Sequence, residues 1–311
     1  SWESKSSGIV HDLNSVYFLT QEIGWTVGGG GKILKTTDSG ENWVSHSVWN
    51  EYVLESVEFI DHNIGWAVGR LYSNSSGIIL KTIDGGINWN PQLSIQVPTL
   101  RSVSFLDSNN GWAGGLGITL RTTNGGTDWT SKPITGYIWS IDFTDLNNGW
   151  AACDYGIILR TSDGGFSWET QESNTNIDLR SLDFINQNIG FAVGLNGTII
   201  KTLDSGQSWT ALNSSITSEN LFDVKFVSSF IGWVVGTNGT VLSTSDGGLH
   251  WTNQTNNITS DLYSVSFVNE NTAWAVGDAS VDNRGRIFFT TDGGLNWSLI
   301  YTSSTESFQS V

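Results

Sequence analysis

The chain has 311 residues, among them 36 glycines, 16 tryptophans, three prolines, one cysteine and no methionine. A hydrophobic fraction of 38% is enough for a folded core, and the length allows one large domain or two ordinary ones. No stretch approaches the roughly 18–20 apolar residues of a membrane helix, so we expect no direct membrane insertion. The net charge of −16 argues against nucleic acid as a partner, because phosphates require clustered Lys and Arg.

A single cysteine cannot form an internal disulfide, and no Cys-x-x-Cys or His/Cys pattern predicts a metal or another cofactor. The chain starts at Ser1 without an apolar leader, so we expect a processed product. The acidic, Asn/Ser/Thr/Gly-rich composition favours a secreted, extracellular or cell-surface protein, with the periplasm or thylakoid lumen as alternatives. The many tryptophans could form either a sugar-binding surface or a core.

Self-similarity is the strongest signal in the sequence. A Gly-Trp step, or its Gly-Phe or Ala-Trp variant, begins at residues 24, 65, 111, 149, 190, 232 and 273. A box resembling Thr/Ser-x-Asp-x-Gly-x-x-Trp follows each step, and its tryptophan recurs every 39 to 46 residues. A phenylalanine stands six residues before every step, which indicates turns at fixed places.

Each copy is expected to form four short strands separated by Asn, Gly and Asp, with no helical period. Four strands repeated seven times are typical of a β-propeller, whose radial closure hides most sheet edges. We therefore predict an all-β, seven-bladed β-propeller with four antiparallel strands per blade, in a single domain of residues 1–311. In chain order, the repeats span residues 13–53, 54–99, 100–137, 138–178, 179–220, 221–261 and 262–301.

Both chain ends continue the repeat pattern. Trp2 lies eleven residues before Leu13, the spacing found between the first two copies, so residues 1–5 are predicted to form a fourth-type strand. Residues 308–311 are predicted to begin a first-type strand. We expect the N-terminal strand to lie near the last blade and lock the ring, although a longer parent protein or strand exchange with a neighbour would give the same pattern.

The box residues are interpreted as scaffold. A short carboxylate between the third and fourth strands can accept N–H groups of its own hairpin, and the tryptophan can pack against the blade. Thirteen tryptophans fill the two repeat positions and Trp2 shares their register, which leaves Trp49 and Trp139 outside the pattern. Cys153 replaces the glycine of the other six copies and is interpreted as a small buried thiol.

The string Gly-Trp-Ala-Val-Gly…Ile-Leu-Lys-Thr-x-Asp-Gly-Gly-x-Asn-Trp resembles the propeller family of photosystem II assembly and stability factors. It is also similar to the wider Asp-box group, the bacterial neuraminidase repeats. The resemblance covers residues 13–297 and implies the propeller fold. It implies several functions, because similar repeats occur in assembly factors, sialidases, xyloglucanases and sorting receptors.

The chain departs from these relatives in two respects. Assembly factors, as the resemblance implies, hold a membrane-protein partner on a basic patch, whereas this chain has 14 basic and 30 acidic residues. Five of the basic residues share one repeat position and are interpreted as a scaffold row: Lys35, Lys81, Arg121, Arg160 and Lys201. The Arg-Ile-Pro start of sialidases is missing, as are nucleophile and phosphate-loop motifs. No catalytic residue is assigned, and a two-carboxylate glycosidase stays open.

Variable repeat positions are the candidate binding residues, because constant positions build the blades. In the innermost strand, one variable residue follows a nearly constant leucine: Asn14, Glu55, Arg101, Trp139, Arg180, Phe222 and Tyr263. These residues should surround the mouth of the central channel, and they range from charged to aromatic as recognition surfaces do. Unconstrained loop residues would vary in the same way. We predict a site formed by Arg101, Trp139, Arg180, Phe222 and Tyr263.

Two long connections between second and third strands are expected on the same face. The second copy inserts residues 70–76, with Arg70 and Tyr72, and the seventh inserts residues 278–286, with Asp282 and Arg284. In a closed ring they would flank the first copy and form a cleft, which makes Arg70, Tyr72 and Arg284 rim candidates. Neutral variation in loop length is the alternative.

The favoured function is a non-catalytic, secreted or cell-surface propeller that binds a protein partner as an assembly scaffold. The first alternative is a carbohydrate-binding or glycoside-hydrolysing propeller, in which Trp139 and Tyr263 would stack on sugar rings. The second alternative is a protein like the photosystem II assembly factors.

Overall fold

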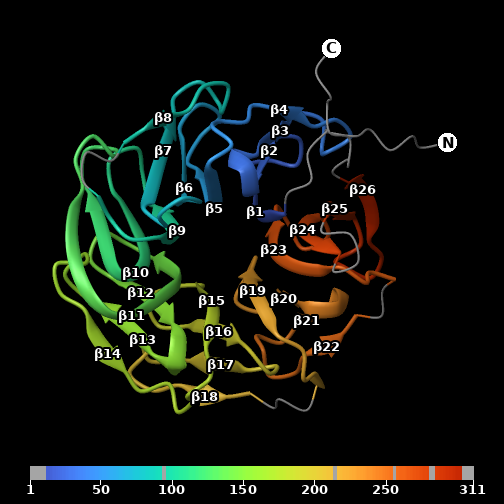
Figure 1. The fold of residues 1–311 in the computed structure, drawn as a ribbon. Helices are drawn as coiled ribbons and strands as arrows, with labels where there is room; N and C mark the ends of the chain where they lie inside the picture. The colour runs from blue at the N-terminus through green and yellow to red at the C-terminus, as the bar shows by residue number, and fades with distance from the viewer. Residues whose placement is uncertain (1–11, 93–95, 213–215, 255–256, 280–283, 303–311) are drawn as a thin grey trace.

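A computed structural model describes residues 12–92, 96–212, 216–254, 257–279 and 284–302 of the chain. Its strands form sheets arranged radially around a central channel, so the all-β propeller architecture is confirmed (Figure 1). Among the described residues, no helix has the length and apolar character needed to cross a membrane. The two predicted end strands, residues 1–5 and 308–311, lie outside the described residues, as does Asp282.

Five of the sheets contain four antiparallel strands each, ordered from the channel outwards as they follow in the chain. The first and second sheets consist of β1 (Leu13–Phe18), β2 (Gly24–Gly28), β3 (Ile33–Thr36) and β4 (Val44–Ser45), and of β5 (Tyr52–Phe59), β6 (Gly65–Leu71), β7 (Gly77–Thr82) and β8 (Asn90–Pro91). The later three consist of β15 (Leu179–Phe184), β16 (Gly190–Gly194), β17 (Ile199–Thr202) and β18 (Thr210–Ala211); of β19 (Leu221–Phe226), β20 (Gly232–Gly236), β21 (Val241–Thr244) and β22 (Thr252–Asn253); and of β23 (Asp261–Phe267), β24 (Ala273–Ala279), β25 (Arg284–Thr290) and β26 (Ser298–Thr302).

The prediction of seven blades with four strands each is wrong, because the described strands form six sheets. The third and fourth sequence repeats share one six-stranded sheet. Its strands are β9 (Leu100–Phe105), β10 (Gly111–Thr122), β11 (Thr130–Phe143), β12 (Gly149–Cys153), β13 (Ile158–Thr161) and β14 (Glu169–Gln171).

Two short connections explain this shared sheet. Trp129 and Ile138 are nine residues apart, whereas Trp43 and Leu54, their counterparts between the first two repeats, are eleven apart. The chain therefore runs from the outer strand of the third repeat into the inner strand of the fourth as one strand, β11. The third repeat also has the shortest distance from step to box. Its second and third strands are therefore continuous and form the single strand β10.

In the first, fourth and sixth repeats, the connection between second and third strands is one residue longer than in the third, and a 3-10 turn forms instead. Such turns are η1 (Gly29–Gly31), η2 (Asp154–Gly156) and η4 (Thr237–Gly239). The middle residues, Gly30, Tyr155 and Asn238, all have a positive φ, which glycine adopts freely, asparagine tolerates and tyrosine rarely adopts. Cys153, just before η2, is buried as predicted, and burial raises the pKa of its thiol.

Consecutive sequence repeats are joined by stacked aromatic rings. The aromatic residue of each step lies flat on the phenylalanine of the next repeat, with ring centroids 3.5 to 4.1 Å apart and interplanar angles of 7° to 18°. We call these contacts the seams. The stacked pairs are Trp25–Phe59, Trp66–Phe105, Trp112–Phe143, Trp150–Phe184, Phe191–Phe226, Trp233–Phe267 and Trp274–Phe18.

The indole N–H groups at the seams are also satisfied. Trp25 Nε1 donates to the Gly85 carbonyl of the next repeat at 3.0 Å, and Trp274 Nε1 donates to the Ser39 carbonyl at 3.0 Å, which closes the ring. A buried tryptophan usually requires such a partner. The step tryptophans are therefore scaffold, as the sequence predicted. The box tryptophans of the first six repeats pack edge-on against the seam phenylalanines, as Trp43 does against Phe18, so they too are scaffold and not a sugar-binding surface.

The box aspartates are turn formers, as predicted. In the second repeat, Asp84 Oδ1 accepts hydrogen bonds from the Thr82 hydroxyl at 2.8 Å and from the Asn88 backbone at 2.9 Å, and Oδ2 accepts one from the Asn88 amide. The Thr82 hydroxyl in turn accepts the Gly86 N–H. In the third repeat the two residue types are exchanged: Asn124 stands at the position of Asp84, and Asp128 at that of Asn88. The Asn124 amide donates to Asp128 Oδ2 at 2.9 Å.

The basic scaffold row packs against the seams. Lys81 Nζ lies 5.2 Å from the Trp66 ring centroid and donates to the Gly125 carbonyl at 2.7 Å. Lys201 Nζ contacts Phe191 and the Gly247 carbonyl in the same way. These lysines stabilise seams through cation–π contacts and carbonyl hydrogen bonds, so they do not form a clustered patch for a partner.

Candidate functional site at the mouth of the central channel

A cavity of about 400 Å³ occupies the central channel. The inner strands of all seven sequence repeats line it, and each strand contributes the variable residue that the sequence singled out. These residues are Asn14, Glu55, Arg101, Trp139, Arg180, Phe222 and Tyr263. The leucine or isoleucine before each is buried, as Leu54 and Leu179 show. That anchor holds the strand while the next side chain projects towards the channel, because side chains alternate along a strand.

One side of the mouth carries a cluster of guanidinium groups and aromatic rings, formed by Arg101, Tyr137, Trp139 and Arg180. The guanidinium carbon of Arg180 lies 3.6 Å from the Trp139 ring centroid, and that of Arg101 lies 4.8 Å from it. The Tyr137 ring centroid is 4.6 Å from that of Trp139, and the Tyr137 hydroxyl accepts a hydrogen bond from Arg101 Nε at 2.6 Å. We call these four residues the guanidinium–indole cluster.

Each arginine of this cluster has a carboxylate partner. Arg101 Nη1 lies 2.7 Å from Glu55 Oε2, and Arg180 Nη2 lies 3.2 Å from Asp178 Oδ2. Burial lowers the pKa of Arg180, Asp178 opposes this effect, and Arg101 adds to it. The cluster is thus preorganised, with planar N–H donors beside an aromatic face, which suits carboxylate and backbone carbonyl groups of a ligand.

The opposite side of the mouth is acidic. The Tyr263 hydroxyl donates to Asp278 Oδ1 at 3.0 Å, and the Tyr263 ring packs against Phe222 with centroids 5.5 Å apart. Burial raises the pKa of Asp278 to about 6, and the nearby Asp12 and Asp261 carboxylates contribute to the increase. The mouth therefore has a cationic side with aromatic rings and a side rich in carboxyl groups.

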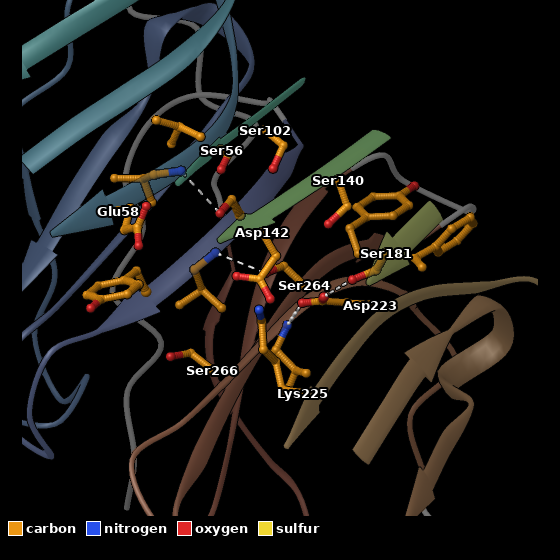
Figure 2. Close-up of a pocket in the computed structure, with 18 of the residues that line it drawn as sticks. Ser56, Glu58, Ser102, Ser140, Asp142, Ser181, Asp223, Lys225, Ser264 and Ser266 are labelled. Carbon is orange, nitrogen blue, oxygen red and sulfur yellow. Dashed lines mark hydrogen bonds between the residues drawn. The ribbon is translucent and has the colours of Figure 1, made fainter. Parts of the chain in front are cut away.

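Below the mouth, serines connect the inner strands of neighbouring repeats, and Figure 2 shows them along the channel wall. Ser102 Oγ accepts the N–H of Ile141 in the next repeat at 3.1 Å, and Ser264 Oγ accepts the N–H of Val16 at 3.3 Å across the ring closure. In the sixth repeat Asp223 takes the serine's place and accepts the Val265 N–H at 2.9 Å. This layer is structural, because its acceptors are used within the ring.

The next layer inwards holds charged side chains that are partly exposed in the channel. Lys225 Nζ lies 3.4 Å from Asp183 Oδ1; burial would lower the pKa of Lys225, but Asp183, Asp223 and Asp142 outweigh this effect and raise it. Burial raises the pKa of Glu58 to about 8 and that of Asp142 to about 6. In Figure 2, Glu58, Asp142, Asp223 and Lys225 lie along the same channel. Within the described residues, no group of three His, Cys, Asp or Glu side chains could hold a metal.

The three rim candidates are placed differently from one another. Arg70 reaches the mouth, where its Nε lies 3.5 Å from Glu55 Oε1. Tyr72 is 55% exposed, and its ring centroid is 5.8 Å from the guanidinium carbon of Arg70. Arg284 begins β25, where it pairs with Ala279 of β24. None of the three lines the channel cavity, so the insertions extend hairpins beside the mouth.

The sequence did not single out Tyr137 or the charged layer of Glu58, Asp142, Asp183 and Lys225. A signal was present for the charged layer: three residues after each mouth position, the inner strand varies again, through Tyr17, Glu58, Ser104, Asp142, Asp183, Lys225 and Ser266. Tyr137 lies before the buried Ile138, in the segment that β11 joins to the preceding repeat, and no repeat pattern marks it.

Comparison with known proteins agrees with this architecture. A search of curated proteins gave no match. The solved structure described as YCF48 bound to D1 peptide is 20% identical, with 94% of this chain and 96% of that chain covered and a TM-score of 0.75. YCF48 from Cyanidioschyzon merolae is 21% identical, with 94% and 98% covered and a TM-score of 0.72. The WD40 propeller domain of Doa1 is 14% identical, with 98% and 96% covered and a TM-score of 0.67.

These structural likenesses, all below 25% identity, concern the fold. A family model gives the more specific result. The model described as photosynthesis system II assembly factor YCF48 matches residues 46–136, 131–217 and 211–305, which together span most of the chain. The resemblance noted in the sequence is thereby confirmed, and the chain belongs to the family of photosynthesis system II assembly factor YCF48.

Proposed function

We propose that this chain is a non-catalytic assembly factor that holds a short extended segment of a partner protein at the mouth of its central channel. The observation that carries the proposal is the guanidinium–indole cluster of Arg101, Tyr137, Trp139 and Arg180. Arginine and aromatic residues dominate the binding energy of protein interfaces, above all where their geometry is fixed before binding.

The size of the site supports a segment of chain over a folded domain. The cavity volume of about 400 Å³ falls within the range of small-ligand pockets. Arg180 is the anchor in this proposal. Within the described residues, its guanidinium forms one ion pair, which joins Nη2 to Asp178. Its remaining N–H groups suit a carboxylate or a backbone carbonyl, and stacking on the rigid Trp139 ring fixes the position of the guanidinium before binding.

Family membership and the solved relative suggest the class of partner. The relative described as YCF48 bound to D1 peptide holds a peptide on a propeller of the same fold. We extend this to a peptide partner for the present chain, and we place the complex outside the cytoplasm. The acidic, Asn/Ser/Thr/Gly-rich composition supports that location. Recovery of a tagged chain mainly from the cytoplasmic fraction of its host would contradict it.

Carbohydrate binding has less support. Trp139 is the one repeat-independent tryptophan at the mouth, and its ring has Arg180, Arg101 and Tyr137 groups centred within 5 Å. A sugar ring stacks on an open aromatic face, and that face is crowded here. Trp49 is 53% exposed but packs edge-on against Tyr52 and does not line the channel.

Binding of a labelled D1 peptide, followed by fluorescence anisotropy, tests the proposal. We expect the wild-type chain to bind the peptide, and we expect Trp139→Ala and Arg180→Ala each to weaken binding about tenfold or more, as truncated interface anchors do. Trp49→Ala and Lys132→Ala remove an exposed ring and an exposed cation, neither of which lines the channel cavity, and serve as matched controls.

Two results would contradict different parts of the proposal. Wild-type binding that both mouth variants leave unchanged would show that the site is elsewhere. A lack of wild-type binding would exclude the D1 peptide as a partner of this chain.

A further inference from the structure

Glu55 is the acidic member of the mouth positions, and three donors already contact its carboxylate. Its Oε2 lies 2.7 Å from Arg101 Nη1 and accepts a hydrogen bond from Asn14 Nδ2 at 3.4 Å, while its Oε1 lies 3.5 Å from Arg70 Nε. These donors come from three different repeats. Only 7% of the Glu55 side chain is exposed, so the carboxylate is nearly removed from water.

The two arginines beside Trp139 are therefore neutralised in different ways. Arg101 is bound to the buried Glu55 at 2.7 Å, whereas Arg180 is bound at 3.2 Å to Asp178, whose side chain is 27% exposed. Solvent screens the more exposed pair, so a ligand carboxylate can compete with Asp178. Competition with Glu55 would leave a buried carboxylate without its partner, which is strongly unfavourable.

We propose that Glu55 is the residue that determines charge specificity at the mouth. The Glu55 carboxylate already occupies the position beside Arg101 and Arg70 in which a second carboxylate of the ligand would bind. The mouth therefore accepts a segment with one acidic side chain, held by Arg180, and gains nothing from a second. This inference rests on the proposed function, because it concerns the ligand of the same site.

On the cationic side of the mouth, three arginines form ion pairs with two carboxylates. Arg70, Arg101 and Arg180 face Glu55 and Asp178. Removing the Glu55 charge leaves Arg101 and Arg70 without a carboxylate partner among the described residues, which creates a fork of N–H donors matched to a second acidic side chain. The change is confined to the mouth, because Glu58, on the same strand, points its carboxylate to the Phe105 N–H inside the channel.

Two synthetic peptides test the inference: acetyl-Ser-Glu-Tyr-Ser-Gly-amide and acetyl-Ser-Glu-Tyr-Glu-Gly-amide, labelled for fluorescence anisotropy. For the wild-type chain we expect the two dissociation constants to agree within about twofold. We expect the peptide with two glutamates to bind Glu55→Gln about tenfold more tightly than it binds the wild type. This is the gain in affinity that one additional desolvated charge pair contributes. Raising the salt concentration should reduce this gain.

Matched variants separate specificity from folding and from general charge. Glu169→Gln changes the net charge equally at an exposed position of β14 and should leave the peptide preference unchanged. The double variant Glu55→Gln/Arg101→Gln should lose most of the gain. Far-ultraviolet circular dichroism must show the same fold for all variants. A Glu55→Gln chain that folds but does not bind the second peptide more tightly overturns the inference.

Peptide binding by Trp139→Ala and Arg180→Ala tests the proposed function separately. If Trp139→Ala and Arg180→Ala leave peptide binding unchanged, the mouth is not the binding site, whatever Glu55→Gln does. If those variants weaken binding while Glu55→Gln leaves the peptide preference unchanged, the mouth is the site and Glu55 does not determine its charge specificity.

Discussion

The seams and the channel mouth satisfy their polar and aromatic groups in opposite ways. At the seams the same solution is repeated: a flat aromatic stack, an indole hydrogen bond to the next repeat and a Thr–Asp turn. At the mouth each residue has its own partner, such as Glu55 for Arg101, Asp178 for Arg180 and Asp278 for Tyr263.

This difference explains the sequence pattern. A contact that must be made at every seam leaves little freedom at its positions, so tryptophan, phenylalanine and aspartate recur. A mouth residue is restrained only by its immediate neighbours, so its identity can follow a ligand. The comparison predicts that changes at seams reduce stability strongly and that changes at the mouth alter binding more than folding.

The largest effect is expected from Trp274→Ala. The Trp274 side chain is fully buried, stacks on Phe18 and donates to Ser39, so its loss opens the seam that closes the ring. We expect a loss of about 3–5 kcal/mol in the free energy of unfolding, measured by denaturant titration. Trp49→Ala, at an exposed tryptophan, should change it by less than about 0.5 kcal/mol. Equal effects of the two variants would contradict the scaffold role of the seams.

A smaller effect is expected from exchanging the side chains of one box turn. Asn88→Asp places two carboxylates side by side and should cost about 1–2 kcal/mol. Asp84→Asn replaces a charged acceptor and should cost about 0.5–1 kcal/mol. The double variant recreates the Asn124–Asp128 arrangement of the third repeat and should recover most of the loss. Thermal or denaturant unfolding of all four chains gives the coupling energy; additive losses would exclude a reciprocal turn.

A third effect is expected inside the channel and depends on pH, so it is small at acidic pH. The pKa of Glu58 is raised from 4.5 to about 8, so the folded state holds a proton that the unfolded state releases between these values. The wild type should therefore lose stability as the pH rises from about 5 to 8. Glu58→Gln should lose less over this range, because only the raised pKa values of groups such as Asp142 and Asp278 still contribute.

Thermal unfolding of both chains measures this difference. The variant should be more stable than the wild type by about 1–2 kcal/mol at pH 8.5 and by much less at pH 5.5, where Glu58 is mostly protonated in the folded state. The expected difference is small because the Glu58 side chain is partly exposed in the channel and solvent screens its charge. A stability difference that is the same at both pH values would show that Glu58 is ionised in the folded state.

The sequence predicted much of the fold because the repeat fixes both the strands and the packing of their aromatic residues. The mouth positions were also predictable, because one variable residue after a buried leucine marks where the inner strand enters the channel. Placement of Arg101, Trp139 and Arg180 in one cavity follows from that rule. Their function at the mouth stays a prediction.

The number of sheets could not be predicted from the repeat count alone. Seven copies form six sheets because two connections around the third copy are short, and the chain then continues as β10 and β11 where other copies turn. The short spacing between Trp129 and Ile138 indicated the continuous strand. A comparison of repeats, however, interprets such differences as variation in loop length. Ion pairs such as Glu55 with Arg101 form between side chains of different repeats. Their partners depend on side-chain conformation, which a strand pattern does not predict.

The ring closure has a consequence for how such a chain can be built and altered. The last sheet obtains its four strands from β23 to β26, and its contact with the first sheet uses the same stack, indole donor and serine acceptor as other junctions. The closing junction is thus chemically equivalent to the rest. A gene encoding the repeats in rotated order, with new ends placed in a surface connection, would specify the same set of contacts, so the order of the units along the chain is interchangeable while their order around the ring is not.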